Sequence, residues 1–419
     1  MKNIYSSIDI GTDAIKVVVC ELYQNKLNLL AAASVKSQGI KKGLIYDVDL
    51  ARISLRKAVK EIEEMLGIRL KQVLCSVPSY YASFNLVTSS IRIEPTIDNE
   101  VAEIEGSDIS AILKRASYTR RNPSEEIVAT LPIDFKIDNK VVVKSPLGMP
   151  ASKLDARAIA VTVPKKNIYS VVNLVESVGL TVKDISITGI GDIYAFKNKD
   201  MDNKVGAIIN IGSETTSISL YNKGVIVKNS MIALGGKNID HDLCYIYKLN
   251  PSVATTIKEK FALAHKRNAK AGEIYEVANN EKETIKINQL EASEIVQARL
   301  TEILGLAKKE IRSLTSREMD YILVTGGTSN MTNFASTVTE VLGRNSTIGN
   351  MKLIGVRNNA FSASVGNIVY YISKLKLLGI RDTMVSEDDV YNLTSMSSDI
   401  SATSNETMLG KVFGYFFNE

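Results

Sequence analysis

Two glycine turns are the features of this chain whose residue types and spacing most suggest chemistry. The first ends the run SIDIG at Gly11, and the second ends the run IINIG at Gly212. A glycine at a turn lets backbone N–H groups approach a phosphate closely, and neighbouring hydroxyl groups add further donors. The pair therefore predicts a phosphate-binding site, although either turn alone is typical of an ordinary hairpin.

Charged and hydroxyl side chains surround these turns. Asp9 is a candidate to hold Mg²⁺ through water, and Lys16, on the strand that leaves the first turn, is a candidate to reach a phosphate oxygen. A third loop, 326–328, follows the apolar strand 321–325 and lets the backbone pack against a flat ring or a ribose; a plain strand-to-helix turn is its alternative. The residues predicted to contact the nucleotide are Asp9, Gly11, Thr12, Asp13, Lys16, Asn210, Gly212, Ser213, Glu214, Thr215, Gly236, Gly326, Gly327 and Thr328.

The strands that must position the two glycine turns also repeat. Strands over 15–20 and 27–33 follow the first turn, and strands over 217–221 and 225–232 follow the second. Each copy predicts a three-stranded meander. Two copies separated by a domain's length predict two similarly folded lobes, each offering one glycine turn to a shared cleft. Chance similarity between hairpins is the alternative.

Helices account for much of the remaining chain. Apolar residues at steps of three and four predict an amphipathic helix over 55–66, capped near Asp47 or Asp49, and a second helix over 291–313. Because strands alternate with such helices, the sequence predicts an α/β fold.

Composition excludes several classes of protein. The chain has 419 residues, 45% of them hydrophobic and 23% charged, so it is neither disordered throughout nor an integral membrane protein. A net charge of +5 is too small for a nucleic-acid-binding excess. Three cysteines without a CxxC pair and two histidines without an HExxH spacing suggest no metal cluster. The N-terminus lacks the order of a secretory signal, so we expect a cytoplasmic protein.

The C-terminal region changes character twice. Over 381–407, ten of 27 residues are Ser or Thr and six acids face a single Arg, which predicts a flexible acidic linker. Residues 408–419 then predict an amphipathic helix at a membrane surface; docking on the chain's own core or on a partner groove is the alternative. The residues expected to bind lipid are Leu409, Lys411, Val412, Phe413, Phe416 and Phe417.

The motifs together resemble the actin, Hsp70 and sugar-kinase superfamily, and within it the FtsA family of bacterial cell-division proteins. The stretches SIDIGTDAIK, NIGSETTSISLYNKG and VTGGTSNMTNF resemble the phosphate-1, phosphate-2 and adenosine motifs of the superfamily. Three further stretches resemble the FtsA family itself: VKSQGIKKGLIYD, SPLGMPASKLDARAIAVTVP and QARLTEI. The likeness spans nearly the whole chain.

This resemblance implies an actin-like two-lobed ATPase fold that binds ATP with Mg²⁺. It implies a core of lobe 1 over 1–83 and 162–195, an FtsA-type inserted subdomain over 84–161, a core of lobe 2 over 196–236 and 326–380, a helix-rich subdomain over 237–325, the linker 381–407 and the membrane-targeting helix 408–419. It also implies polymerisation, and binding of the tubulin-like protein FtsZ on the helix-rich subdomain, for which Arg299 and Glu302 are candidates. Lys258 falls where relatives place a lysine that contacts the nucleotide; a solvated helix charge is its alternative.

One departure from the superfamily pattern bears on catalysis. Many members carry an aspartate at the head of the phosphate-2 motif, where this chain has Asn210. An amide cannot supply that charge, so nucleotide-dependent assembly is favoured over brisk hydrolysis. Glu214 is a candidate to compensate, and Asp192 lies close in sequence to the connecting helix, but no catalytic residue is assigned.

We therefore expect a scaffold that polymerises on the cytoplasmic face of the membrane at the division septum and tethers FtsZ there. Its expected partners are FtsZ, further copies of itself, membrane lipids and other divisome proteins, with no nucleic acid. The alternatives are a phosphotransferase or ATPase of the same superfamily and an FtsA-like component of type IV pilus assembly. The C-terminal segment argues against both alternatives, because neither needs a membrane anchor.

Overall fold

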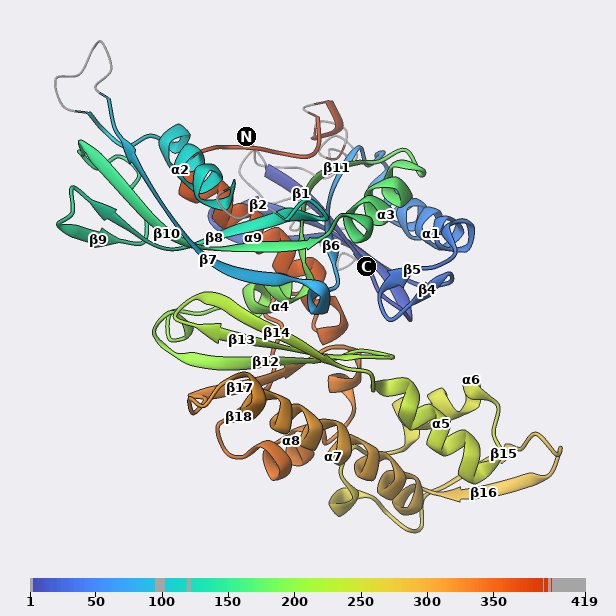
Figure 1. The fold of residues 1–419 in the computed structure, drawn as a ribbon. Helices are drawn as coiled ribbons and strands as arrows, with labels where there is room; N and C mark the ends of the chain where they lie inside the picture. Colours follow the sequence, from blue (N-terminus) through green and yellow to red (C-terminus); the bar gives the residue numbers. More distant parts are fainter. Residues whose placement is uncertain (1–2, 95–101, 119–121, 387, 391–392, 394–419) are drawn as a thin grey trace. The chain divides into compact units, whose positions relative to one another are not determined.

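The computed structural model describes residues 3–94, 102–118, 122–386, 388–390 and 393. Its contacts divide the chain into two compact units, whose elements are labelled in Figure 1. Unit 1 comprises Met1–Ala195, Lys352–Arg357 and Ala363–Glu419, and unit 2 comprises Phe196–Met351 and Asn358–Ser362.

Unit 1 is built on a five-stranded sheet with the order β11-β6-β1-β2-β3. The first three strands, β1 (Asn3–Ile10), β2 (Ala14–Tyr23) and β3 (Lys26–Lys36), form the antiparallel meander that the sequence predicts. Gln24 and Asn25 close its second turn with positive φ angles of 46° and 61°, a conformation common in two-residue hairpin loops. The strands β6 (Gln72–Val77) and β11 (Thr181–Ile187) extend the sheet in parallel.

Two helices pack together against this sheet. Helix α1 (Val48–Leu66) begins where Asp47 accepts a hydrogen bond from the Leu50 backbone N–H, which confirms one of the two predicted caps. Helix α3 (Lys165–Glu176) lies beside α1. A small hairpin of β4 (Ile40–Lys41) and β5 (Leu44–Ile45) precedes α1, and the short η1 helix (Ser79–Tyr81) follows β6.

The helix α9 (Ser362–Leu378) differs from our expectation, which placed residues up to 380 in lobe 2. From Ala363 onward it belongs to unit 1, where it crosses α4 (Thr188–Phe196). A Cβ on Gly366 would fall on the Gly191 carbonyl, so glycines permit this close crossing. The Asn367 side chain then donates to the Cys75 carbonyl and accepts from the Ser186 hydroxyl. These buried hydrogen bonds fix α9 on the unit 1 sheet.

The inserted subdomain of unit 1 is a four-stranded sheet covered by one helix. Its strand order is β7-β10-β8-β9, and α2 (Gly106–Tyr118) packs on one face. The strands are β7 (Ser83–Arg92), β8 (Glu125–Ile137), β9 (Val141–Val143) and β10 (Lys153–Pro164). Ile109 and Ile112 of α2 share a buried cluster with Phe135 and Leu154, so the subdomain has a core of its own.

The start of the predicted linker is ordered, which corrects our expectation that 381–407 cannot bury a core. Strand β6 pairs with β1 at Ser7 and Ile8. Nearer the start of β1, the backbone of Ile4 forms hydrogen bonds with residues of the segment 382–386 instead. Met384 N–H donates to the Ile4 carbonyl at 2.9 Å, and Ile4 N–H donates to the Thr383 hydroxyl at 3.2 Å. Met384 and Val385 are buried. We call residues 382–386 the strap.

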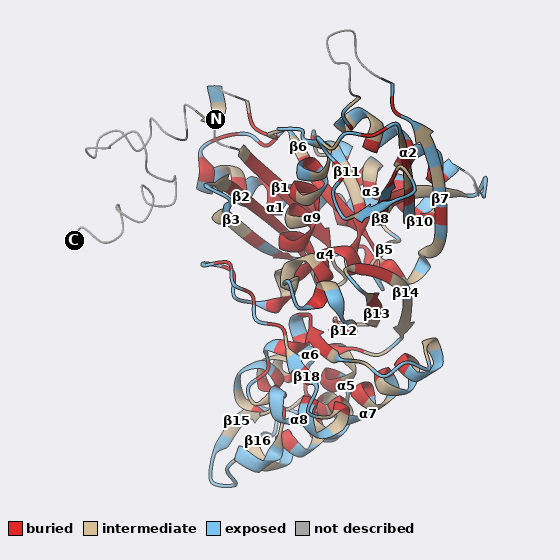
Figure 2. Ribbon diagram, turned by 90° about the vertical axis from the view of Figure 1, so that its left-hand side faces the viewer, coloured by how far each residue is buried: buried red, intermediate tan, exposed pale blue. Residues whose placement is uncertain are grey.

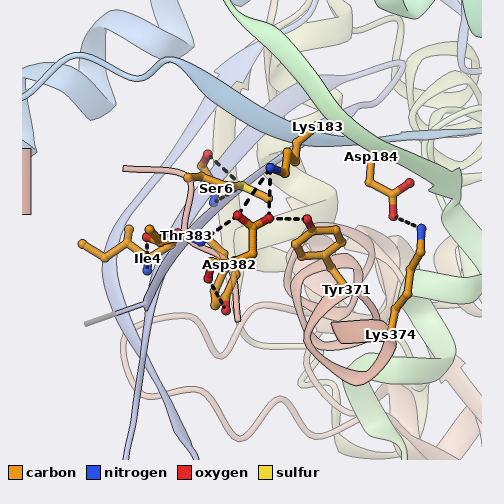
Figure 3. Close-up of polar contacts among 10 residues, drawn as sticks. Ile4, Ser6, Lys183, Asp184, Tyr371, Lys374, Asp382 and Thr383 are labelled. Atoms are coloured by element: carbon orange, nitrogen blue, oxygen red, sulfur yellow. Dashed lines mark hydrogen bonds and ion pairs between the residues drawn. The ribbon is translucent and has the colours of Figure 1, made fainter. Parts of the chain in front are cut away.

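Asp382 holds the strap in place. Figure 3 shows its carboxylate between Lys183 of β11, at 3.1 Å, and the Tyr371 hydroxyl of α9, which donates at 2.6 Å. The Tyr5 hydroxyl donates to the Asp382 carbonyl. The strap therefore satisfies backbone groups that the sheet leaves unpaired beside β1.

Unit 2 repeats the sheet topology of unit 1. Its order, β14-β13-β12-β17-β18, again places a meander beside two parallel strands. The strands are β12 (Val205–Ile211), β13 (Thr216–Asn222), β14 (Val225–Ile232), β17 (Tyr321–Thr325) and β18 (Ser346–Ile348). The repeat that the two glycine turns predict is thus confirmed in the topology of both units.

The helix-rich part of unit 2 follows β14. It contains α5 (Gly236–Tyr247), α6 (Pro251–Thr256), the π-helical turn η3 (Ile257–Phe261), the hairpin β15 (Ile274–Ala278) and β16 (Thr284–Asn288), and α7 (Gln289–Leu314). Figure 2 shows the hairpin as largely exposed, whereas α7 buries one side. Helix α8 (Phe334–Leu342) packs against α7, and the short helices η2, η4, η5 and η6 span Met201–Asn203, Lys266–Asn268, Gly327–Asn330 and Asn359–Phe361.

Candidate nucleotide-binding site

The Gly212 turn of unit 2 is a tight connection between β12 and β13. Gly212 N–H donates to the Thr215 carbonyl at 3.0 Å, which closes the turn. The carbonyl oxygens of Gly212 and Ser213 accept hydrogen bonds from the N–H groups of Gly236 and Lys237, at 2.9 and 2.8 Å. The first residues of α5 therefore dock directly on this turn.

Two glycines make that docking possible. A Cβ on Gly235 would lie 2.6 Å from the carbonyl oxygens of both Gly212 and Ser213. A Cβ on Gly236 would lie 2.8 Å from the Thr328 hydroxyl and 3.6 Å from the Lys258 ammonium. The missing side chain of Gly236 thus lets the N-terminus of α5 approach Thr328 and Lys258 closely, and the helix dipole there favours an anion.

The 326–328 turn packs against the same backbone segments. Gly326 has a φ of 93°, and a Cβ there would collide with the Asn210 side chain and the Ile211 carbonyl. Only glycine adopts this conformation readily so close to another backbone. The Thr328 hydroxyl donates to the Gly212 carbonyl at 3.3 Å. The phosphate-2 and adenosine motifs are therefore in contact within unit 2.

Lys258 lies in the interior of the site instead of on a solvated helix face, which was its alternative. Its ammonium is 2.8 Å from the Asp240 carboxylate and 3.4 Å from the Gly236 carbonyl, and both side chains are buried. The lysine lies in the π-helical turn η3, a rare geometry that often marks functional sites. Sequence reasoning missed Asp240, Gly235 and Lys237; the GG pair in ALGGKNID was the available signal for Gly235.

Asn210 and Glu214 are both engaged within unit 2. The Asn210 side chain lies against the Gly326 turn, as described above. The Glu214 carboxylate accepts from Lys237 of α5 at 2.9 Å. Glu214, the candidate to compensate for Asn210, is therefore held in an ion pair with Lys237 of α5.

The Gly11 turn of unit 1 has the same backbone hydrogen bond. Gly11 N–H donates to the Ala14 carbonyl at 3.2 Å, as Gly212 donates to Thr215. Asp9 and Lys16 are register partners on β1 and β2, and their side chains pair at 2.8 Å. The Thr12 hydroxyl accepts from Gly43 N–H at 2.8 Å, which ties the β4–β5 hairpin to the turn. Asp13 is exposed beside them.

As far as the structure describes the chain, the surroundings of the Gly11 turn would offer a magnesium ion few protein ligands. Among the described residues, no group of three or more His, Cys, Asp or Glu side chains is arranged to hold a metal. Asp9 is nearly buried and already paired with Lys16, which fits the expected contact through water better than direct ligation. A single paired carboxylate fits a magnesium ion whose main ligands would be the phosphates of the nucleotide.

The candidate partner residues form a charged cluster on α5 and α7. Arg299 donates to both carboxylate oxygens of Asp242, at 2.7 and 2.8 Å, and also to Glu302 at 2.5 Å. The hydrogen bond to Asp242 is the main reason why the pKa of the Arg299 guanidinium lies above its ordinary value. Tyr245 and Ile246 lie exposed on α5, 88% and 53% respectively. The two helices thus present charged and apolar side chains together.

The six residues expected to bind lipid, from Leu409 to Phe417, lie outside the described residues. Within the described ranges, no helix has both the length and the apolar character needed to cross a membrane.

Comparisons with known proteins agree with the fold. A family profile described as cell division protein FtsA matches residues 207–366, and one described as the SHS2 domain inserted in FtsA matches residues 86–162. The FtsA proteins of Bacillus subtilis and Enterococcus hirae are 28% and 24% identical to this chain. The alignments cover 90% and 96% of this chain and 85% and 91% of those proteins.

Solved structures show the same architecture at low sequence identity. The PilM-PilN type IV pilus biogenesis complex gives a TM-score of 0.57 at 16% identity and covers 89% of this chain and 98% of that chain. MreB5 of Spiroplasma citri bound to AMPPNP gives 0.55 at 14% identity, with coverage of 89% and 97%.

The repeated sheets and the two glycine turns thus define an actin-like α/β protein with an inserted SHS2 subdomain. Within that class, the chain belongs to the FtsA family of cell division proteins. The recognition made from the sequence motifs is confirmed.

Proposed function

We propose that this chain is an ATP-binding scaffold that polymerises and tethers FtsZ filaments to the membrane during division. The observation that carries the proposal is the close meeting of backbone segments at Gly236. Backbone from the Gly212 turn, the N-terminus of α5 and the 326–328 turn meet there, beside the buried Lys258. Such a meeting of close backbones, a helix N-terminus and a cation suits a phosphate ester.

Within unit 2, the nucleotide is expected to bind beside the Gly212 turn and the 326–328 turn. Gly212, Ser213 and Thr215 would hold phosphates, and Gly326, Gly327 and Thr328 would line the adenosine side. When bound, Mg²⁺ would neutralise phosphate charge, and Asp9 would contact it through water. AMPPNP bound to the similar MreB5 fold supports ATP as the ligand.

Assembly is favoured over rapid turnover in this proposal. The position of the usual phosphate-2 aspartate is occupied by Asn210, and Glu214 is paired with Lys237. Neither side chain is therefore a ready general base for an attacking water. Nucleotide binding would instead stabilise the form of the protein that polymerises.

The FtsZ contact is proposed on α5 and α7. Arg299, held by Asp242 and Glu302, lies on the α7 turn that faces α5, and exposed Tyr245 and Ile246 add apolar area. Arginine and tyrosine are the residues that most often anchor protein interfaces. An extended or helical tail of FtsZ carrying both apolar and charged side chains fits this surface.

The membrane contact is proposed for residues 408–419. Burial of four apolar side chains of this segment is worth about 6 to 12 kcal/mol, but ordering the backbone costs about 1 to 2 kcal/mol per residue. One segment should therefore bind weakly, and a polymer that presents many of them should bind tightly through effective concentration.

Equilibrium binding of a fluorescent ATP analogue tests the nucleotide site directly. The parent protein should bind it in the presence of Mg²⁺, and Lys258→Met should bind it at least tenfold more weakly while retaining its fold. If both proteins bind equally, or neither binds, the region around Gly236 and Lys258 is not a nucleotide site.

A further inference from the structure

Helix α1 carries an exposed apolar face that the proposed function does not use. Tyr46, just before the helix, is 69% exposed, and Leu50 and Ile53 on its first turns are 37% and 64% exposed. Most apolar residues of α1, including Leu55 and Ile62, are buried against the sheet. An exposed apolar cluster on the outer side of an amphipathic helix commonly marks a contact surface.

Cations continue the same face toward the end of the helix. Ile53, Lys57 and Lys60 follow one another at steps of four and three residues, so they share one side of α1. Arg56 lies beside them. In the part of the chain that the structure describes, neither Arg56 nor Lys57 forms an ion pair, whereas Lys60 pairs with Glu64 at 3.4 Å and Arg52 with Asp49 at 3.0 Å. We call Tyr46, Leu50, Ile53, Arg56, Lys57 and Lys60 the α1 face.

The described residues that follow the strap lie near the last turn of α1. The strap is fixed at β1, and Asp389 then pairs with Lys71 at 3.3 Å. Leu70 N–H donates to the Glu63 carboxylate of α1 at 2.9 Å, which holds the residue before Lys71 against the helix. Asp389, which precedes the segment 408–419 by about 20 residues in the sequence, therefore lies near the end of α1.

We infer that the α1 face is a second membrane contact, which lies on the anionic surface of the bilayer when segment 408–419 is inserted. This inference rests on the proposed membrane tethering. Apolar side chains followed by cations on one helix side, with Arg56 and Lys57 outside any ion pair of the described residues, are the pattern of surfaces that bind anionic lipid. The segment itself offers one lysine, Lys411, against Glu419, so the face supplies the charge that the anchor lacks. Two weak membrane contacts together bind far more tightly than one.

Sedimentation with lipid vesicles tests the inference, with phosphatidylcholine alone and with added phosphatidylglycerol. The variants are Ile53→Glu and the double variant Arg56→Glu/Lys57→Glu in the full-length chain. We expect Ile53→Glu to weaken binding to both vesicles about fivefold. The double variant should weaken binding to the anionic vesicles about tenfold, with little change on phosphatidylcholine. Matched controls are Leu86→Glu, at an apolar side chain 60% exposed on β7, and Lys140→Glu at an exposed turn.

The outcomes separate this inference from the anchor proposal. If a chain ending at Thr407 binds vesicles as well as the parent, the anchor proposal fails. If truncation abolishes binding but the α1 variants match the parent, only the inference about α1 is overturned. Light scattering without vesicles is the second measurement, because a loss of polymer in the α1 variants would make the face a contact between copies and would also overturn the inference.

Discussion

The ammonium of Lys258 lies 2.8 Å from the carboxylate of Asp240, and both side chains are buried beside Gly236. The lysine belongs to η3 and the aspartate to α5, the helix that docks on the Gly212 turn. A buried charge of either sign is costly without its partner. The pair therefore couples η3 to α5, and with it the position of the cation that we propose contacts the nucleotide.

Removal of the Asp240 charge should lower both stability and nucleotide affinity. Asp240→Asn leaves the Lys258 ammonium buried without a counter-charge, and we expect the free energy of unfolding to fall by about 3 kcal/mol. Urea unfolding followed by circular dichroism measures the loss. A fall below about 0.5 kcal/mol would show that the pair is not buried in solution.

The double variant Asp240→Leu/Lys258→Met serves as the control for that experiment. It removes both charges, so most of the lost stability should return, since an apolar pair can replace a buried ion pair. Affinity for an ATP analogue should stay low, because the cation is gone. Recovery of affinity together with stability would mean that Lys258 acts only through folding.

Substitution of Gly236 should affect binding more than folding. In Gly236→Ala the new Cβ would lie 2.8 Å from the Thr328 hydroxyl, so the 326–328 turn and the start of α5 would have to shift apart at the proposed phosphate contact. We expect affinity for the ATP analogue to fall about tenfold, which is about 1.4 kcal/mol of binding free energy. Gly305→Ala on α7 is the control, because a Cβ there meets open space. It should stabilise the fold by about 0.5 to 1 kcal/mol and leave binding unchanged.

Loss of Arg299 should weaken the FtsZ contact. Arg299→Ala removes the guanidinium that Asp242 and Glu302 hold at the α7 surface, and we expect the affinity for an FtsZ tail peptide to fall at least tenfold, or about 1.4 kcal/mol. Fluorescence anisotropy of the labelled peptide measures it. Arg312→Ala, near the end of the same helix, should bind like the parent; equal loss in both variants would argue against a local contact.

The strap should contribute stability that disappears in acid. Burial raises the pKa of Asp382, but the hydrogen bond from Tyr371 and the contacts with Lys183 outweigh it, so this pKa lies below its ordinary value. A carboxyl with a lowered folded pKa stabilises the protein above its unfolded pKa, about 3.9, and the effect is lost as the pH falls through the folded pKa. The free energy of unfolding of the parent should therefore exceed that of Asp382→Asn by about 2 kcal/mol at pH 7.

Urea unfolding of both proteins between pH 7 and pH 3 measures this difference. The two unfolding curves should converge below about pH 4, where the Asp382 carboxylate of the parent takes up a proton. A constant difference over that range would assign the stabilisation to the shape of the side chain instead of its charge.

Much of the fold follows from short-range patterns in the sequence. The glycine turns and their flanking apolar runs predict both meanders, because hairpins are encoded locally. The Asp47 cap and the spacing of apolar residues likewise predict α1. The strap was missed because two apolar residues, Met384 and Val385, are hidden in a segment rich in Ser, Thr and acids. The strap binds the start of β1, beyond the part of β1 that pairs with β6, and β1 lies at the other end of the chain.

The candidate site was predictable only in part. Glycines are typical of places where backbone segments approach closely, so the sequence pointed to Gly212, Gly236 and Gly326. The partners of charged side chains depend on tertiary packing, which no spacing reveals. Asp240 and Lys258 are 18 residues apart on different elements, and Glu214 meets Lys237 across a turn. That α9 belongs to unit 1 was missed for the same reason.

Flotation of FtsZ filaments with lipid vesicles tests the central claim most directly. Full-length protein, a chain ending at Thr407 and the Lys258→Met variant would each be mixed with FtsZ and vesicles, with and without ATP. We predict that FtsZ floats with the full-length protein, more so with ATP, and stays in solution with the truncated chain. FtsZ that floats equally with the truncated chain, or never floats with the full-length protein, would contradict a nucleotide-dependent membrane tether.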